Sequence, residues 1–162
     1  MEFGTLADWM AALAAVGALA VGALGWSTAN RLGRAEDERL RRRQAEQVSS
    51  WFAAEIREPA LVYGVMVSNS SSNLIYDIEV EAKSKYDAGY PPLRLTCLPP
   101  GTHWVPWNGK EWDFPVDASV VSNELRPIAR SGKLGIKRLQ FRDASDSLWT
   151  REEQGALRQL AV

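Results

Sequence analysis

An uninterrupted apolar stretch near the start of the chain constrains its architecture more than any other feature. Residues 9–26 begin and end with tryptophan, and no charged side chain occurs between Asp8 and Arg31. As a helix rising about 1.5 Å per residue, the stretch would be about 27 Å long, close to the roughly 30 Å hydrocarbon core of a bilayer. Tryptophan favours the headgroup level at both membrane surfaces. The sequence predicts one transmembrane helix over residues 9–26, preceded by a short extracytoplasmic N-terminus, residues 1–8.

A cleaved signal peptide and a buried helix of a soluble protein are the alternatives to a membrane span. Signal peptides carry a basic leader before the apolar run, whereas residues 1–8 are acidic and the arginines follow the run. The uncharged length and the flanking tryptophans disfavour a buried helix. The stretch is rich in Ala and Gly and poor in Leu, so we expect its insertion to be favourable by a small margin.

Small residues recur along one face of this expected helix. They are spaced three or four positions apart: Ala11, Ala14, Ala18, Gly22 and Gly25. Such a stripe allows two helix backbones to approach closely. Two hypotheses stay open: the stripe packs against a second copy or another membrane helix, or it is the surface of an alanine-rich span without a partner.

The basic residues around the span predict its orientation. No Lys or Arg precedes it, and six arginines follow within about twenty residues: Arg31, Arg34, Arg39, Arg41, Arg42 and Arg43. Because such residues stay on the cytoplasmic side, we expect a single-pass protein of the cell (inner) membrane with its N-terminus outside and its C-terminal part in the cytoplasm. We interpret the arginines as topogenic groups that contact lipid headgroups.

Charge and cysteine usage limit the partners further. The net charge is −1 and acids are interleaved with the arginines, so nucleic acid is not an expected partner. The single cysteine, Cys97, excludes an internal disulfide and a cysteine-based metal cluster, and an unpaired thiol fits a reducing compartment.

Residues 27–58 favour a helix that continues from the span. Arg, Glu, Ala, Gln and Leu dominate, and no proline occurs before Pro59. An apolar stripe at helical spacing consists of Ala45, Val48, Phe52 and Ile56. We expect a juxtamembrane amphipathic helix that packs on the following domain or on a second copy, and that Pro59 ends.

After Pro59 the apolar residues change from helical spacing to alternation, which is typical of strands. Residues 61–67 and 76–82 alternate in this way, and the polar, turn-forming residues 68–73 separate them, which predicts a β-hairpin. Acids between the alternating positions of the second segment should place its other face in water.

The rest of the chain has weaker signals of the same kind. Further strands are expected at 93–97, 134–141 and 148–151, a hairpin turn at 143–147, an edge strand or short helix within 155–162, and a loop at 102–115. Six or seven short strands without crossover helices fit a small antiparallel β-sandwich, and an open barrel is the alternative. The expected fold class is α+β, with the sandwich over residues 59–162.

Several segments together resemble a known group of proteins. They are the expected span, an arginine-rich helix ending in Trp-Phe, and the motifs Val-Ser-Asn-Ser-Ser-Ser-Asn-Leu-Ile-Tyr-Asp-Ile-Glu-Val, Leu-Pro-Pro-Gly and Phe-Arg-Asp-Ala-Ser-Asp-Ser-Leu-Trp-Thr-Arg. The chain resembles uncharacterised single-pass membrane proteins of actinobacteria and their phages. The resemblance implies an immunoglobulin-like sandwich and structural roles for a set of residues: Asn69, Tyr76, Gly101, Phe141, Asp143 and Trp149. It carries no biochemical activity.

Catalytic chemistry is not expected. His103 is the only histidine, and alternation from Leu93 and Leu95 points Cys97 to the core, where a thiol is inert. Acids near residue 143 are interpreted as turn formers. The sequence contains no phosphate-binding glycine loop, and we expect neither a cofactor nor a bound metal.

Three tryptophans close together are the best candidate for a binding site. Trp104, Trp107 and Trp112 lie in one loop-like region, and aromatic faces serve as stacking platforms or as hot spots of interfaces. The alternative is that one is a core residue and the others shield a sheet edge.

Two functions are consistent with these features. The first is a non-enzymatic membrane-anchored adaptor that uses its cytoplasmic β-sandwich for protein interaction. The second is a membrane effector in phage–host conflict, in which the β-domain senses a ligand or clusters and thereby drives association of the transmembrane helix.

The small-residue stripe can be tested directly. Replacing Ala18 and Gly22 with Ile should abolish self-association of the span, because bulky side chains keep the backbones apart. A membrane two-hybrid assay measures this association, and an unchanged signal would reject the stripe hypothesis.

Overall fold

The computed structural model describes residues 10, 26, 32–33, 36–84 and 89–161 of the chain. The chain divides into two compact units, Met1–Leu40 and Arg41–Val162. The predictions about the membrane span and its small-residue stripe fall on residues 9–26, which lie outside the described residues except for Met10 and Trp26. Among the described residues, no helix has the length and apolar character needed to cross a membrane.

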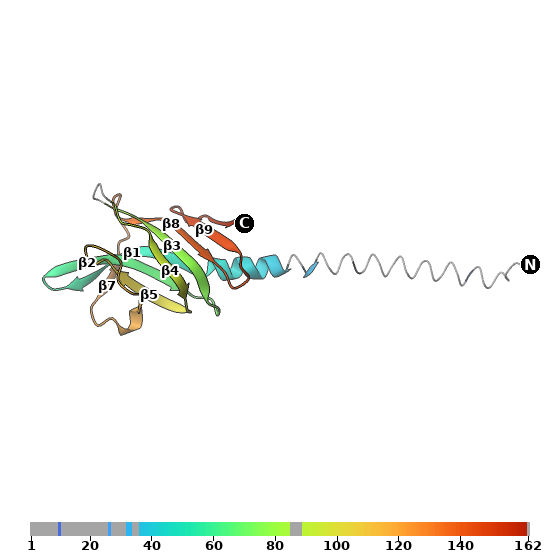
Figure 1. Cartoon of the computed structure of the whole chain (residues 1–162), viewed down its shortest axis with the longest axis horizontal. Coiled ribbons are helices and arrows are strands. Elements are labelled where there is room, and N and C mark those ends of the chain that lie inside the picture. The colour runs from blue at the N-terminus through green and yellow to red at the C-terminus, as the bar shows by residue number, and fades with distance from the viewer. Residues whose placement is uncertain (1–9, 11–25, 27–31, 34–35, 85–88, 162) are drawn as a thin grey trace, which may run out of the picture. The chain divides into compact units, whose positions relative to one another are not determined.

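Two antiparallel sheets of five strands each dominate the described part of the second unit (Figure 1). The first sheet consists, in spatial order, of β6 (Val116–Asp117), β5 (Gly101–Pro106), β2 (Ala60–Asn69), β1 (Val48–Arg57) and β7 (Leu125–Pro127). The second sheet consists of β10 (Leu157–Leu160), β9 (Leu148–Glu152), β8 (Gly135–Arg142), β3 (Ile75–Lys83) and β4 (Leu93–Leu98). A short 3-10 helix, η1 (Ala118–Val120), follows β6.

Apolar side chains from both sheets form one core between them, the arrangement of packed sheets in sandwiches. Its fully buried members include Phe52, Val65 and Val67 from the first sheet and Ile75, Ile78, Val80, Leu98, Leu139 and Phe141 from the second. This architecture is consistent with the expected antiparallel β-sandwich, since two separate sheets are found and not one open barrel.

The prediction of a helix over residues 27–58 is wrong for the second half of this range. Residues 36–46 are helical, but the residues after them form β1, which pairs along its whole length with β2. The apolar positions from Val48 to Ile56 are four residues apart, and this spacing satisfies one face of a helix and one face of a strand equally. Pro59 lies in the turn of the β1–β2 hairpin instead of ending a helix.

The hairpin expected from residues 61–67 and 76–82 is also wrong, because β2 lies in the first sheet and β3 in the second. β2 pairs with β1 and β5, and β3 pairs with β4 and β8. The polar residues between them form a crossing from one sheet to the other. Alternation indicates which face of a strand is buried, but it does not identify the neighbouring strand.

Asn69, at the end of β2, organises this crossing. Its side chain is fully buried, and its Nδ2 donates to the backbone oxygens of Asn73 at 2.8 Å and of Leu98 at 3.3 Å. Its Oδ1 accepts from the backbone nitrogen of Ser71 at 3.2 Å and from Ser71 Oγ at 2.7 Å. One amide therefore joins the end of β2, the crossing and the end of β4.

Strand β3 changes face at Asp77, whose backbone φ is 48°. Ile75 and Ile78 are buried, whereas Tyr76 is 39% exposed and pairs with Cys97, which is also exposed. The buried face predicted for Tyr76 and the core position predicted for Cys97 are both wrong. The positive φ interrupts the two-residue period of the strand, and a non-glycine residue adopts it too rarely for a sequence pattern to reveal it.

The C-terminal strands match the predictions, but one expected loop does not. β8 and β9 pair around the turn at residues 143–147, and β10 is an edge strand beside β9. Asp143 closes the turn by accepting from the backbone nitrogen of Ser147 at 2.9 Å and from Trp149 Nε1 at 2.8 Å. Within the loop expected at 102–115, β5 forms and pairs with β2.

The buried amide of Asn69 makes the crossing sensitive to a single substitution. Asn69→Ala should lower the free energy of unfolding by about 2–3 kcal/mol, because buried backbone groups lose their partners. Asn73→Ala is the matched control, since Asn73 takes part through its backbone oxygen. Chemical denaturation of the full chain in detergent, followed by tryptophan fluorescence, measures both, and equal losses would contradict the role given to Asn69.

Candidate functional site

The chain between β5 and β7 covers the outer face of the first sheet; we call residues 107–124 the covering segment. Because β6 and β7 lie at opposite edges of the sheet, this segment runs from one edge to the other. A second apolar cluster lies beneath it, formed by the buried residues Ala53, Met66 and Trp104 with Trp51, Ala118, Val121 and Leu125 packed against them. The first sheet is therefore buried on both faces, which explains the continuous burial of the end of β2.

The three tryptophans singled out in the sequence lie in two places. Val105 points into the sandwich core, and its neighbour Trp104 points to the outer face of the first sheet, where it is 1% exposed. Trp107 and Trp112 lie beyond the end of β5 and contact each other, with their ring centroids 5.1 Å apart. The structure brings Trp107 and Trp112 together and places Trp104 in a different cluster.

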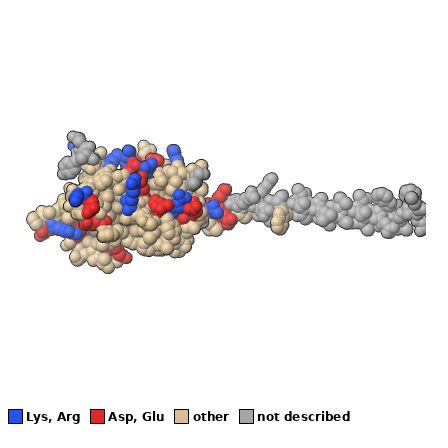
Figure 2. Space-filling view, in the orientation of Figure 1, with Lys and Arg blue, Asp and Glu red and all other residues tan. Residues whose placement is uncertain are grey.

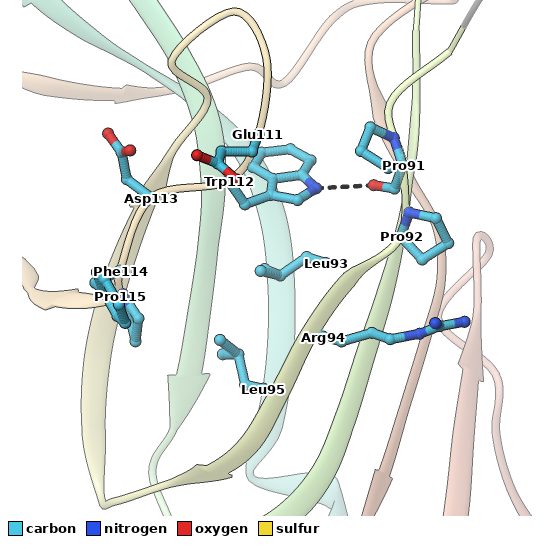
Figure 3. A pocket seen from close by; sticks show the side chains of 10 residues that line it. All are labelled: Pro91, Pro92, Leu93, Arg94, Leu95, Glu111, Trp112, Asp113, Phe114 and Pro115. Atoms are coloured by element: carbon cyan, nitrogen blue, oxygen red, sulfur yellow. Dashed lines mark hydrogen bonds between the residues drawn. The ribbon is translucent and has the colours of Figure 1, made fainter.

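Trp107 and Trp112 pack against Tyr90, each with a centroid distance of 5.4 Å; we call these three residues the aromatic clasp. Trp112 Nε1 also donates to the backbone oxygen of Pro91 at 2.8 Å (Figure 3). Tyr90 and Pro91 precede β4 in the second sheet, whereas the tryptophans follow β5 in the first. The clasp fastens the two sheets to each other at one side of the sandwich.

A buried carboxylate beneath the covering segment was not expected from the sequence. Glu55 of β1 is 2% exposed. Its Oε2 accepts from Arg57 Nη2 at 2.8 Å and from Trp104 Nε1 at 3.3 Å, and its Oε1 accepts from Asn123 Nδ2 at 2.7 Å. These contacts join β1, β5 and the covering segment through one side chain.

The surroundings of Glu55 favour its charged form. The hydrogen bond from Arg57 is the largest cause and lowers the pKa of Glu55 below its ordinary value. Burial acts in the opposite direction, and the hydrogen bonds from Asn123 and Trp104 lower the pKa further. The carboxylate is therefore ionised at neutral pH. Its two oxygens already accept hydrogen bonds from three side chains, so Glu55 holds neighbouring segments together and is not available as a free acid or base.

A pocket of about 500 Å³ opens above Glu55 and Trp104. Three apolar side chains of the covering segment stand at its rim: Phe114, Val116 and Val120, which are 90%, 40% and 74% exposed. We call them the apolar ridge. The volume lies within the roughly 300–1,000 Å³ of typical ligand pockets, and clustered exposed apolar side chains mark interaction sites.

A second pocket of about 390 Å³ lies alongside β4; we call it the β4 groove (Figure 3). Residues 91–95 form one wall and residues 111–115 the other. Phe114 lines both this groove and the pocket above Glu55. The covering segment thus presents its most exposed aromatic ring between two hollows.

The arginines that follow the expected span are exposed where the structure describes them. Arg31 and Arg34 lie outside the described residues, and the others lie on the helical residues 36–46: Arg39, Arg41, Arg42 and Arg43. Two of them form ion pairs on that helix, Arg39 with Glu36 at 3.9 Å and Arg42 with Glu46 at 3.2 Å. Their proposed contact with lipid headgroups stays a prediction.

Charges of both signs are interspersed on the face of the sandwich that Figure 2 shows. On the outer face of the second sheet, Glu79 forms ion pairs with Arg94 at 2.9 Å and with Arg138 at 3.2 Å. Such pairing offsets the charges of these residues over short distances.

The two residues considered for catalysis lie in different sheets. Cys97 is on β4 of the second sheet and exposed, and His103 is on β5 of the first sheet and buried. His103 pairs with Asp117 of β6 across the strands. Within the described ranges, no group of three or more His, Cys, Asp or Glu side chains is arranged to hold a metal ion.

No protein-family model matches the chain, and comparisons with curated proteins and with solved structures found no match.

The low pKa of Glu55 links the stability of the sandwich to pH. A glutamate in the unfolded chain has a pKa of about 4.3, which is higher than the pKa of Glu55 in the folded protein. Between these two pKa values the unfolded chain binds more protons than the folded protein does, so the free energy of unfolding rises with pH in this range. Glu55→Gln should lower the free energy of unfolding at pH 7 by about 1–3 kcal/mol, because Gln presents an N–H to donors that need an acceptor. The difference from wild type should shrink as the pH falls through the folded pKa.

Denaturation of the full chain in detergent between pH 2.5 and 7 measures this difference. Glu124→Gln is the matched control, because Glu124 is an exposed acid whose ion pair among the described residues is with Arg126, and it should leave stability nearly unchanged. A Glu55→Gln difference that stays constant with pH would show that the charge of Glu55 does not stabilise the fold.

Proposed function

We propose that the protein is a non-enzymatic, membrane-anchored adaptor whose β-sandwich binds a protein partner through the apolar ridge. The observation that carries the proposal is Phe114, a large aromatic side chain that is 90% exposed beside two other exposed apolar residues. Residues 9–26 anchor the protein in the cell membrane, with the N-terminus outside, the arginines at the lipid headgroups and the sandwich in the cytoplasm.

Burial of the apolar ridge would supply binding free energy. Removing apolar surface from water stabilises a complex by about 25 cal/mol per Å², and aromatic anchors are frequent hot spots of interfaces. An exposed phenylalanine gains nothing from this effect until a partner covers it. The pocket behind the ridge adds a concave surface that a protruding side chain of the partner can enter.

The ridge is also held in place before binding, which lowers the entropy that a partner must overcome. Asp117 caps η1 by accepting from the backbone nitrogen of Ser119 at 2.8 Å and from Ser119 Oγ at 2.7 Å. Asn123 is bound to the buried Glu55. These contacts fix the covering segment on both sides of Val120.

We further propose that the sandwich is immunoglobulin-like. In such domains strands A, B and E share one sheet, and strands G, F, C and C′ share the other. The order β1–β2–β5 in the first sheet and β9–β8–β3–β4 in the second supports this correspondence. β6, β7 and β10 are then additions at the sheet edges.

Substitution at the ridge tests the proposed function. Val120→Lys should reduce the amount of co-purifying partner at least tenfold, because it places a charge in an apolar interface. Leu61→Lys is the matched control, since Leu61 is 53% exposed on β2 and does not line the pocket behind the ridge. Affinity purification of the full chain from native membranes in mild detergent, with quantification of the proteins retained, measures the difference.

Two results would overturn the adaptor proposal. One is equal retention of every co-purifying protein by the wild type and Val120→Lys. The other is rapid loss of membrane potential on overexpression that depends on Ala18 and Gly22, which would favour the membrane effector.

A further inference from the structure

We propose that the β4 groove binds an extended peptide of the partner, which adds a strand to the free edge of β4 and carries apolar side chains next to basic ones. This inference rests on the proposed function and specifies the chemistry of a second contact. It uses residues of the groove that the apolar ridge does not include.

The edge of β4 is available for another strand. β4 is the last strand of the second sheet, and among the described residues it pairs only with β3. Alternate N–H and C=O groups along the other side of an edge strand point away from its sheet, and they can pair with an added strand. The edge is six residues long, from Leu93 to Leu98, and Pro91 and Pro92 precede it.

The groove beside this edge provides a place for side chains of the added strand. Leu93 and Leu95 point from β4 toward residues 111–115 (Figure 3); Leu93 is buried in the sandwich core at the base of the groove, and the half-buried Leu95 offers apolar surface to the added strand. Trp112 and Phe114 contribute apolar surface from the opposite wall. Because side chains of a strand alternate, every second side chain of the peptide would enter the groove while its backbone pairs with β4.

The charges at the groove select the peptide. Arg94 points away from the two leucines in Figure 3 and forms an ion pair with Glu79 at 2.9 Å, so its charge is already neutralised. Glu111 and Asp113 line the other wall. Asp113 accepts from Asn108 Nδ2 at 2.8 Å and interacts with the charge of Arg57, whereas Glu111 is exposed and has no salt bridge among the described residues. A peptide with Lys or Arg beside its apolar residues complements the carboxylate of Glu111.

The width of the groove is fixed by the molecule itself. Trp112 Nε1 donates to the backbone oxygen of Pro91 at 2.8 Å, which joins the two walls directly above Leu93. Tyr90 packs against Trp107 and Trp112 at the same end. The groove is therefore a preformed slot between the edges of the two sheets, and a peptide does not have to open it.

Binding of two defined probes tests the inference. Fluorescein-labelled eight-residue peptides of alternating leucine and lysine, or of alternating leucine and glutamate, are titrated into the full chain in detergent and followed by fluorescence anisotropy. The lysine peptide should bind at least tenfold more tightly than the glutamate peptide. Glu111→Arg should weaken binding of the lysine peptide about threefold to tenfold and strengthen binding of the glutamate peptide.

Glu153→Arg is the matched control, because it makes the same charge change at an exposed turn beyond β9, three strands from β4. It should leave the ratio between the two peptides unchanged. Amide hydrogen exchange provides the readout of strand addition: saturating lysine peptide should slow exchange in residues 93–98. An equal effect of Glu153→Arg, or binding without slower exchange in these residues, would overturn the inference.

The outcome is separable from that of the ridge experiment. Failure of the peptide to bind or to protect β4, together with loss of the partner in Val120→Lys, rejects the groove and leaves the adaptor proposal standing. If Val120→Lys retains the partner, the adaptor proposal is rejected. Peptide binding that slows exchange in β4 would then still show that the groove binds a peptide, independently of the apolar ridge.

Discussion

The ionised side chain of Glu55 is the interaction on which the candidate site depends. A buried charge is costly unless donors surround it, and here Arg57, Trp104 and Asn123 supply them from three different parts of the chain. The same contacts that satisfy the carboxylate hold the covering segment against the outer face of the first sheet. Together with the pairing of β5 with β6 and the hydrogen bond from Trp112 to Pro91, they fix the position of the apolar ridge and of one wall of the β4 groove.

Polar and aromatic contacts at different ends of the sandwich join the two sheets, in addition to the apolar core between them. Asn69 connects the sheets where β2 crosses to β3, and the aromatic clasp connects them before the start of β4 and after the end of β5. Such contacts have defined directions, so they specify one alignment of the sheets, whereas apolar packing alone tolerates several. The β4 groove owes its shape to this alignment.

The sequence predicts the antiparallel strands well, because alternation of Val65 with Val67 and of Leu139 with Phe141 reflects burial directly. It does not predict which strands are neighbours, since the loop after Asn69 looks the same whether it turns back within a sheet or crosses to another. The sequence predicts a helix where β1 lies, because apolar residues four positions apart fit one face of a helix and one face of a strand.

The candidate site could be predicted only in part. The tryptophans are visible as a cluster, but alternation in β5 separates Trp104 from Trp107 and Trp112, and only the pairing with β2 reveals that alternation. Glu55 looks like an exposed acid of an amphipathic helix until β1 is recognised as a strand. Phe114 looks like one more aromatic residue of a loop, and its exposure follows from the fold of the covering segment.

The junction between helix and sandwich has a mechanical consequence. The helical residues end at Glu46, β1 begins at Val48, and a single residue, Gln47, separates them. Ala45 and Val48 are both fully buried, and Arg151 donates to the backbone oxygen of Glu46 at 3.3 Å. Because only Gln47 separates residues 41–46 from β1, a rotation of the last helical turn about its axis would be transmitted directly to the first strand.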